Sequence, residues 1–137
     1  MSGIKFDSDL IKLMTFFESV TGSKLKDCIM GDRPIFIVEE GGMGKAIGKG
    51  GANIKHIENR LNKKIRLVEF SKDAVQFARN LVHPIDTSKI EMQDGTIVIH
   101  GKDSNSKAML IGRERHNINF ITQIVKRYFG IKDIKVI

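Results

Sequence analysis

AIGKGGANI, residues 46–54, joins an apolar helix end to the start of a second helix through a glycine-rich turn. A related stretch, LIGRERHNI, follows at residues 110–118. An Ile-Gly pair and an Asn-Ile pair recur at the same distances within the two stretches. Self-similarity at a fixed offset is typical of a duplicated structural unit. The sequence therefore predicts two small related domains within the 137-residue chain.

The segments around each turn predict the same order of elements: helix, strand, strand, short helix, turn, longer helix, strand. Apolar residues spaced by three, four and seven predict the first helix at 7–21. Further predicted segments of the first half are strands at 25–30, 35–38 and 64–70. Those of the second half are helices at 71–82 and 104–111 and strands at 87–92, 96–100 and 134–137. This mixture of elements predicts an α+β fold.

Two local signals refine that prediction. Ser71 is the expected cap of the helix that opens the second half. The sequence Gln93-Asp94-Gly95 between two predicted strands favours a hairpin. The boundary between the halves falls at residues 70–72, where no Gly-, Ser- or Pro-rich linker occurs, so we expect the halves to be docked rigidly.

Positive charge is concentrated around the two turns. The chain carries a net charge of +7. By position, residues 1–43 carry −2, residues 44–66 carry +6, residues 67–101 carry −2 and residues 102–137 carry +5. Solvated helix faces are one explanation of such blocks. Their coincidence with both turns favours a polyanionic partner, and nucleic acid above all.

Two common glycine motifs do not fit the first turn. A P-loop needs Gly, four residues, then Gly-Lys-Ser/Thr. Aligned on Gly48 and Lys49, it would place Met43 at the first glycine and Gly50 at the hydroxyl position. A dinucleotide fingerprint that starts at Gly48 would require glycine where Asn53 stands.

The remaining pattern, Ile-Gly-x-x-Gly between two helices, resembles the K homology (KH) domain, a module that binds RNA and single-stranded DNA. The order of elements resembles the type II KH arrangement, a three-stranded mixed sheet with three helices on one face. Two such domains without a linker resemble the archaeal NusA-like proteins of transcription termination and antitermination. This resemblance implies a first KH domain at 1–70 with a complete turn at 48–51. It implies a second KH domain at 71–137 with a degenerate turn at 112–115.

The resemblance implies RNA-binding residues in both turns. Glycine lets a nucleic-acid backbone approach, and the following helix offers amides and its positive dipole end. The candidate residues in the first turn are Ile47, Gly48, Lys49, Gly50, Gly51, Asn53, Ile54 and Lys55. Those in the second turn are Ile111, Gly112, Arg113, Arg115, Asn117 and Ile118.

The second turn departs from the pattern, because Arg115 replaces the final glycine and Glu114 adds a negative charge. Arg113 and Arg115 can compensate as bidentate phosphate donors. Alternatively, the second half is a scaffold that fixes the first. The sequence leaves both possibilities open.

The resemblance implies single-stranded RNA binding in the regulation of transcription termination or antitermination. A KH protein that binds ribosomal RNA in ribosome biogenesis and a protein-interaction scaffold with vestigial RNA loops are the alternatives. Candidate protein partners are RNA polymerase and other transcription factors, and we expect a monomer.

Other functions find little support in the sequence. The catalytic motifs Ser/His/Asp and HExxH do not occur, so we expect no enzyme activity. Cys28 is the single cysteine, and His, Cys and Asp do not cluster with ligand spacing, so we expect neither a metal nor a cofactor. No apolar stretch approaches the roughly 18–20 residues of a membrane span. The start of the sequence has no secretory signal pattern, so we expect a cytoplasmic protein.

Overall fold

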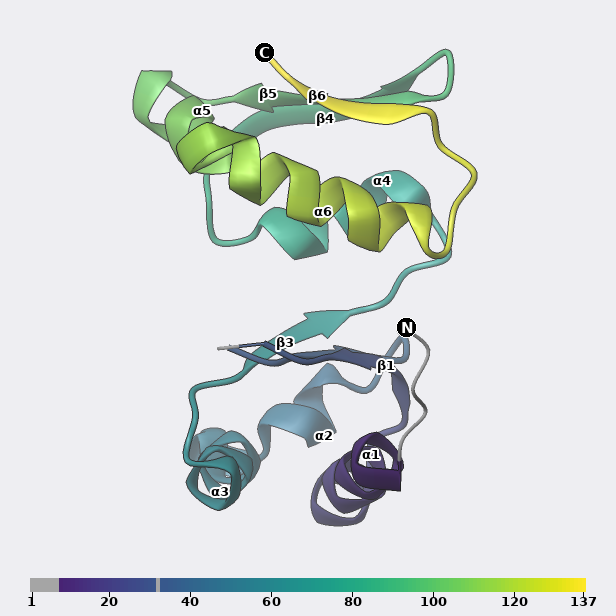
Figure 1. Cartoon of the computed structure of the whole chain (residues 1–137), viewed down its shortest axis with the longest axis vertical. Coiled ribbons are helices and arrows are strands. Elements are labelled where there is room, and N and C mark those ends of the chain that lie inside the picture. The colour runs from purple at the N-terminus through teal and green to yellow at the C-terminus, as the bar shows by residue number, and fades with distance from the viewer. Residues whose placement is uncertain (1–7, 32) are drawn as a thin grey trace. The chain divides into compact units, whose positions relative to one another are not determined.

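The computed structural model of the chain (Figure 1) describes residues 8–31 and 33–137. The chain divides into two compact units, Met1–Phe70 and Ser71–Ile137. Both units have the order helix, strand, strand, helix, 3-10 turn, helix, strand. The predicted α+β class with two three-stranded mixed sheets is thus confirmed.

The first unit begins with a helix whose apolar face follows the predicted spacing. Its elements are α1 (Ser8–Thr21), β1 (Leu25–Ile29), β2 (Ile35–Val38), α2 (Met43–Ile47), η1 (Lys49–Gly51), α3 (Ala52–Leu61) and β3 (Arg66–Glu69). In the sheet, β1 pairs antiparallel with β2, and β2 pairs parallel with β3. Figure 1 shows α1, α2 and α3 on the same side of this sheet.

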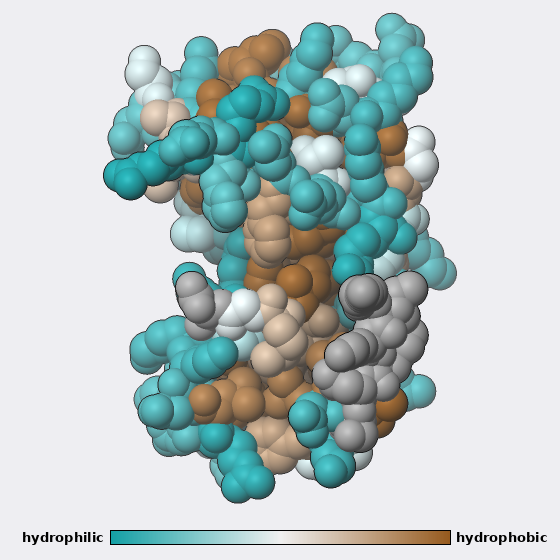
Figure 2. All heavy atoms as spheres, in the orientation of Figure 1, coloured by the Kyte–Doolittle hydropathy of each residue, from teal (hydrophilic) through white to brown (hydrophobic). Residues whose placement is uncertain are grey.

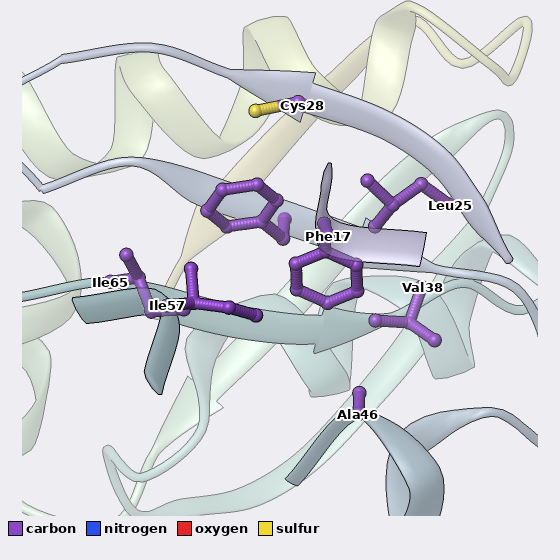
Figure 3. Close-up of a cluster of buried hydrophobic side chains, with 8 residues drawn as sticks. Phe17, Leu25, Cys28, Val38, Ala46, Ile57 and Ile65 are labelled. Carbon is purple, nitrogen blue, oxygen red and sulfur yellow. The ribbon is translucent and has the colours of Figure 1, made fainter. Parts of the chain in front are cut away.

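The core of the first unit lies between these helices and the sheet. Phe17 of α1 stacks on Phe36 of β2, with ring centroids 4.7 Å apart. Figure 3 shows the cluster around them, which includes Ile57 of α3 and Cys28 of β1. Burial of these apolar side chains fixes α3 against the sheet, and α3 begins directly after the glycine turn.

The second unit repeats this arrangement. Its elements are α4 (Ala74–Val82), β4 (Thr87–Gln93), β5 (Thr96–Gly101), α5 (Ser104–Ile111), η2 (Arg113–Arg115), α6 (His116–Lys126) and β6 (Asp133–Val136). Again the first two strands are antiparallel and the last two parallel. The predicted hairpin is confirmed, with Asp94 and Gly95 both at positive φ between paired Gln93 and Thr96. Two positive φ values are what a tight type I′ turn requires.

The prediction that Ser71 caps the first helix of the second unit is wrong. Asp73, not Ser71, precedes α4 in an extended conformation, and its carboxylate accepts the Val75 N–H at 3.2 Å. The Ser71 hydroxyl instead accepts the Asp73 N–H at 3.1 Å. Both residue types can cap a helix, and with Asp73 as the cap α4 begins three residues after Ser71.

Candidate nucleic-acid interface

The first turn has a backbone shape that glycine makes possible. Gly48 ends α2 with φ 76° and ψ 167°, and its N–H donates to the Gly44 carbonyl at 3.0 Å. Gly50 (φ 64°) and Gly51 (φ 77°) are both left-handed and lead directly into α3. A side chain at either of these two positions would meet nothing within 4 Å on the protein side. The two glycines therefore present open backbone at the start of α3.

Gly48 is glycine for an internal reason. A Cβ atom there would lie 2.7 Å from the Asn53 Cγ and 2.9 Å from its backbone nitrogen. The Asn53 side-chain amide donates to the Lys45 carbonyl at 2.8 Å. Asn53 thus ties the start of α3 to the end of α2, across the turn. Recurrence of Asn in both stretches was the signal for this role, although the bond itself was not predicted.

The second turn follows almost the same backbone path with different residues. Gly112 has φ 76° and ψ 170°, close to the values of Gly48. Glu114 (φ 54°) and Arg115 (φ 61°) occupy the left-handed region in place of the two glycines. The Asn117 amide donates to the Leu110 carbonyl at 2.9 Å, so the tie between the helices recurs as well. The second turn keeps its shape although two of its residues are not glycine.

Exposed cations surround the first turn. Lys45, Lys49 and Lys55 are all exposed, and no ion pair involves them in the part of the chain that the structure describes. The single acidic residue of this segment, Glu58, is turned elsewhere: it accepts the Ile65 N–H at 2.9 Å and lies 3.7 Å from the Lys64 ammonium. On β3, burial lowers the pKa of Arg66, and the nearby Arg33 lowers it further.

The second turn combines cations with one carboxylate. A shallow open pocket is lined by Gly112, Arg113, Glu114, His116 and Asn117. The charged side chains here are exposed, and Glu114 has no ion pair among residues 8–31 and 33–137. At the other end of α5, Asp103 accepts the Ser106 N–H at 2.8 Å, and this bond lowers the pKa of the Asp103 carboxyl.

The apolar candidate residues differ in how far they reach the surface. Ile47 is 37% exposed, while Ile54 and Leu67 pack against the core from its edge. In the second unit Ile111 is half-buried, whereas Ile118 is 1% exposed and belongs to the core beneath the turn. Of these candidates, Ile47 is thus the most exposed and Ile118 the most buried.

Three further features of the described residues concern metal ligands, helix length and the cysteine thiol. Within 8–31 and 33–137, no group of three His, Cys, Asp or Glu side chains is arranged to hold a metal ion. In the same ranges, no helix has the length and apolar content needed to cross a membrane. Burial, with a contribution from Asp27, raises the pKa of the Cys28 thiol to about 12, so this cysteine is a poor nucleophile.

Comparison with known proteins identifies a family and similar relatives. A family model described as "KH domain" matches residues 14–85, which begin inside α1 and extend beyond the first compact unit. The "Probable transcription termination protein NusA" of Methanococcus vannielii is 34% identical over 138 residues, covering 98% of this chain and 80% of that protein. Its namesake from Methanocaldococcus jannaschii is also 34% identical, with 100% and 77% covered.

A solved structure resembles nearly the whole chain. It is described as "Crystal structure of APE1850" and gives a TM-score of 0.72 at 27% sequence identity. The match covers 96% of this chain and 100% of that one.

Proposed function

The chain belongs to the KH-domain family of archaeal NusA-like proteins, and from this membership we propose that it binds single-stranded RNA in transcription termination or antitermination. The name shared by the relatives from Methanococcus and Methanocaldococcus favours this function over the binding of ribosomal RNA in ribosome biogenesis. Each compact unit is one KH domain in this proposal, 1–70 and 71–137.

The observation that carries the proposal is the open backbone of Gly50 and Gly51 beside Lys49. Both glycines are at positive φ, nothing on the protein side lies where a side chain would begin, and the helix α3 starts at the next residue. An RNA phosphate placed there meets the positive end of the helix dipole and one exposed ammonium group. KH turns clamp about four nucleotides in this way.

The proposed contacts in the first unit divide by type. Gly50 and Gly51 allow close approach, Lys49 and Lys55 neutralise phosphate, and Ile47 and Ile54 offer apolar contact to bases. Gly48 and Asn53 shape the turn. In the second unit Arg113 and Arg115 contact phosphate through their side chains, Ile111 offers apolar contact, and Gly112, Asn117 and the buried Ile118 hold the turn in place.

Rigid docking of the two units is part of the proposal. It is supported by the chain connection, in which only Phe70-Ser71-Lys72-Asp73 separate β3 from α4. Backbone ¹⁵N relaxation tests it, because rigidly docked units share one rotational correlation time. Clearly different correlation times for α1–β3 and α4–β6 would show that the units move independently.

The expected monomer is tested on the same sample by sedimentation.

RNA binding is tested by fluorescence anisotropy with short single-stranded RNAs at low and moderate salt. The Lys49→Asp/Gly50→Asp variant should lose most of the binding, because each change places a carboxylate against the phosphate. We expect Arg113→Asp/Arg115→Asp to cost less, because the second turn already carries Glu114. Equal losses would show that both turns contribute equally.

A matched control is Gly22→Asp/Lys24→Asp. Gly22 also has positive φ (72°) with nothing within 4 Å, and Lys24 is exposed, so charge change and backbone strain are similar. This control should bind RNA nearly as well as wild type. If a folded Lys49→Asp/Gly50→Asp protein keeps its affinity, the first turn is not the RNA site. If wild type itself does not bind RNA, a protein-interaction scaffold becomes the better explanation.

A further inference from the structure

The exposed side of α3 carries an acid-free row of side chains that continues from the first turn. Lys55, His56, Asn59 and Arg60 recur at helical spacing and are all exposed. We call these four residues the α3 stripe. Glu58, the acidic residue of α3, lies off this row and is held by the Ile65 N–H and Lys64. In Figure 2, hydrophilic side chains line the outer edge at the lower left, where Figure 1 places α3, and hydrophobic side chains lie beside them.

Two planar groups of the stripe rest on an aromatic ring of the neighbouring helix. The ring centroids of His56 and Phe16 (α1) are 5.9 Å apart with an interplanar angle of 37°. The Arg60 guanidinium lies 5.8 Å from the centroid of the same Phe16 ring. Phe16 itself is half-buried and packs against the core. His56 and Arg60 thus both contact the Phe16 ring, and such a contact lowers the cost of ordering them when a ligand binds.

The combination suits one class of ligand. Unstacked RNA bases stack on His rings and on Arg guanidinium planes, while cations along the path contact phosphates. The stripe starts within about one helical turn of Gly51, and from Lys55 to Arg60 it extends about 7.5 Å along the helix axis. We propose that single-stranded RNA leaving the first turn continues along the α3 stripe, with a base stacked on His56 or Arg60 and phosphates beside Lys55 and Arg60.

This inference rests on the proposed RNA-binding function, and it makes the α3 stripe an extension of the clamp. The stripe adds nucleotides beyond the approximately four that the turn holds. Its contribution therefore depends on RNA length, whereas that of the turn does not. This difference separates the two sites experimentally.

The test compares four- and eight-nucleotide RNAs with wild type and His56→Ala/Arg60→Gln. The variant should bind the eight-mer about tenfold more weakly and the four-mer within about twofold of wild type. For the eight-mer, the salt dependence of log K should decrease by about 0.7 for each phosphate that the variant no longer neutralises. 2-Aminopurine placed beyond the fourth nucleotide should be quenched by stacking in wild type and not in the variant.

A matched control is Arg79→Gln/His83→Ala, which removes an exposed arginine and histidine with the same four-residue spacing from α4 and the residue that follows it. It should bind both RNAs as wild type does. An unchanged eight-mer affinity in His56→Ala/Arg60→Gln would overturn the proposal and leave an acidic protein surface as the occupant of the stripe. Equal losses for both lengths would overturn it too. If wild type binds neither RNA, the proposed function itself fails.

Discussion

Glu114 and Arg115 hold backbone conformations that side chains disfavour. Their φ values of 54° and 61° match those of Gly50 and Gly51 in the first turn. The left-handed conformation costs a residue with a side chain about 1–2 kcal/mol. Strain of this kind persists only where the surrounding structure imposes it. Here the close approach of Gly112 to Asn117 and the bonds from Asn117 to the end of α5 impose the turn.

Replacing these residues by glycine should therefore stabilise the protein. Glycine removes the strain but loses about 0.5–1 kcal/mol of conformational entropy. Glu114→Gly and Arg115→Gly should each raise the free energy of unfolding in urea by about 0.5–1 kcal/mol. Arg113→Gly is the control, because Arg113 is not among the residues with positive φ. A loss of stability in Glu114→Gly as large as that in the control would contradict the conformational argument.

The buried environment of Cys28 predicts that its thiol reacts slowly. Burial raises its pKa to about 12, whereas the pKa of the thiol in an unfolded chain is about 8.5. At pH 8 the folded protein should react with iodoacetamide at least about a hundredfold more slowly than the urea-unfolded chain. Equal rates in the folded and unfolded chain would show that the thiol is accessible and ionised.

The same shift predicts the sign of a pH effect on stability. The unfolded thiol loses its proton at lower pH than the folded one, so the unfolded state gains relative stability as the pH rises. The contribution of Cys28 is complete below about pH 8.5 and is lost as the pH rises toward about 12. Between pH 8 and pH 10, wild type should lose more stability than Cys28→Ala.

At the scale of elements, each turn depends on an asparagine that joins two helices. The Asn53 amide donates to the last turn of α2, and the Asn117 amide does the same for α5. Without this donor the helix-end carbonyl loses a bond that water replaces only in part, so Asn53→Ala should cost about 1 kcal/mol of unfolding free energy. Asn59→Ala on the exposed side of α3 should instead be neutral or slightly stabilising, because alanine favours helix.

The asparagine prediction also has a functional readout. A loosened junction between α2 and α3 no longer holds Gly50 and Gly51 in place for a phosphate, so Asn53→Ala should weaken RNA binding without removing any charge. The salt dependence of the remaining binding should then equal that of wild type. A weaker salt dependence would mean that the substitution also removes a contact between a lysine and a phosphate, so that it does more than loosen the junction.

Elements with local signals were predictable from the sequence. The apolar spacing placed α1 within one residue, and Asp94-Gly95 indicated the β4–β5 hairpin, since both features depend on neighbours in the chain. The family resemblance implied a mixed sheet, but the parallel pairing of β2 with β3 was not predicted, because it joins segments far apart in sequence. The left-handed Glu114 and Arg115 could not be foreseen, because their residue types rarely adopt that conformation.

The candidate site, too, could be predicted from the sequence only in part. The glycine turns and the cations beside them were visible in the sequence, because glycine and charge are properties of single residues. The cradle that His56 and Arg60 form on Phe16 was not visible, because it requires α1 and α3 to pack side by side. The close approach of Gly48 to Asn53 was hidden for the same reason.

At the scale of the whole molecule, the two turns share nearly the same backbone conformation but present different chemical groups. The first offers open glycine backbone and lysine, and the second offers arginine side chains on a strained backbone. Each lies within a block of positive charge, +6 for residues 44–66 and +5 for residues 102–137. If both turns bind RNA as proposed, a single RNA that engages both gains affinity, because the second binding event becomes intramolecular.

This linkage predicts how stoichiometry and affinity change with RNA length. A four-nucleotide RNA fits one turn, so it should bind with two sites per protein, and Arg113→Asp/Arg115→Asp should remove one site while the other keeps its Kd. An RNA long enough to span both turns should bind with one site per protein. For that RNA the same variant should raise the Kd by about tenfold or more, because linked sites can gain roughly 10²–10⁴-fold in affinity.

Isothermal titration calorimetry gives both the stoichiometry and the Kd in one experiment. If the long RNA instead binds wild type with two sites, and the variant loses one of them while the other keeps its Kd, each turn holds its own RNA, because a bridging strand cannot lose one anchor without losing affinity.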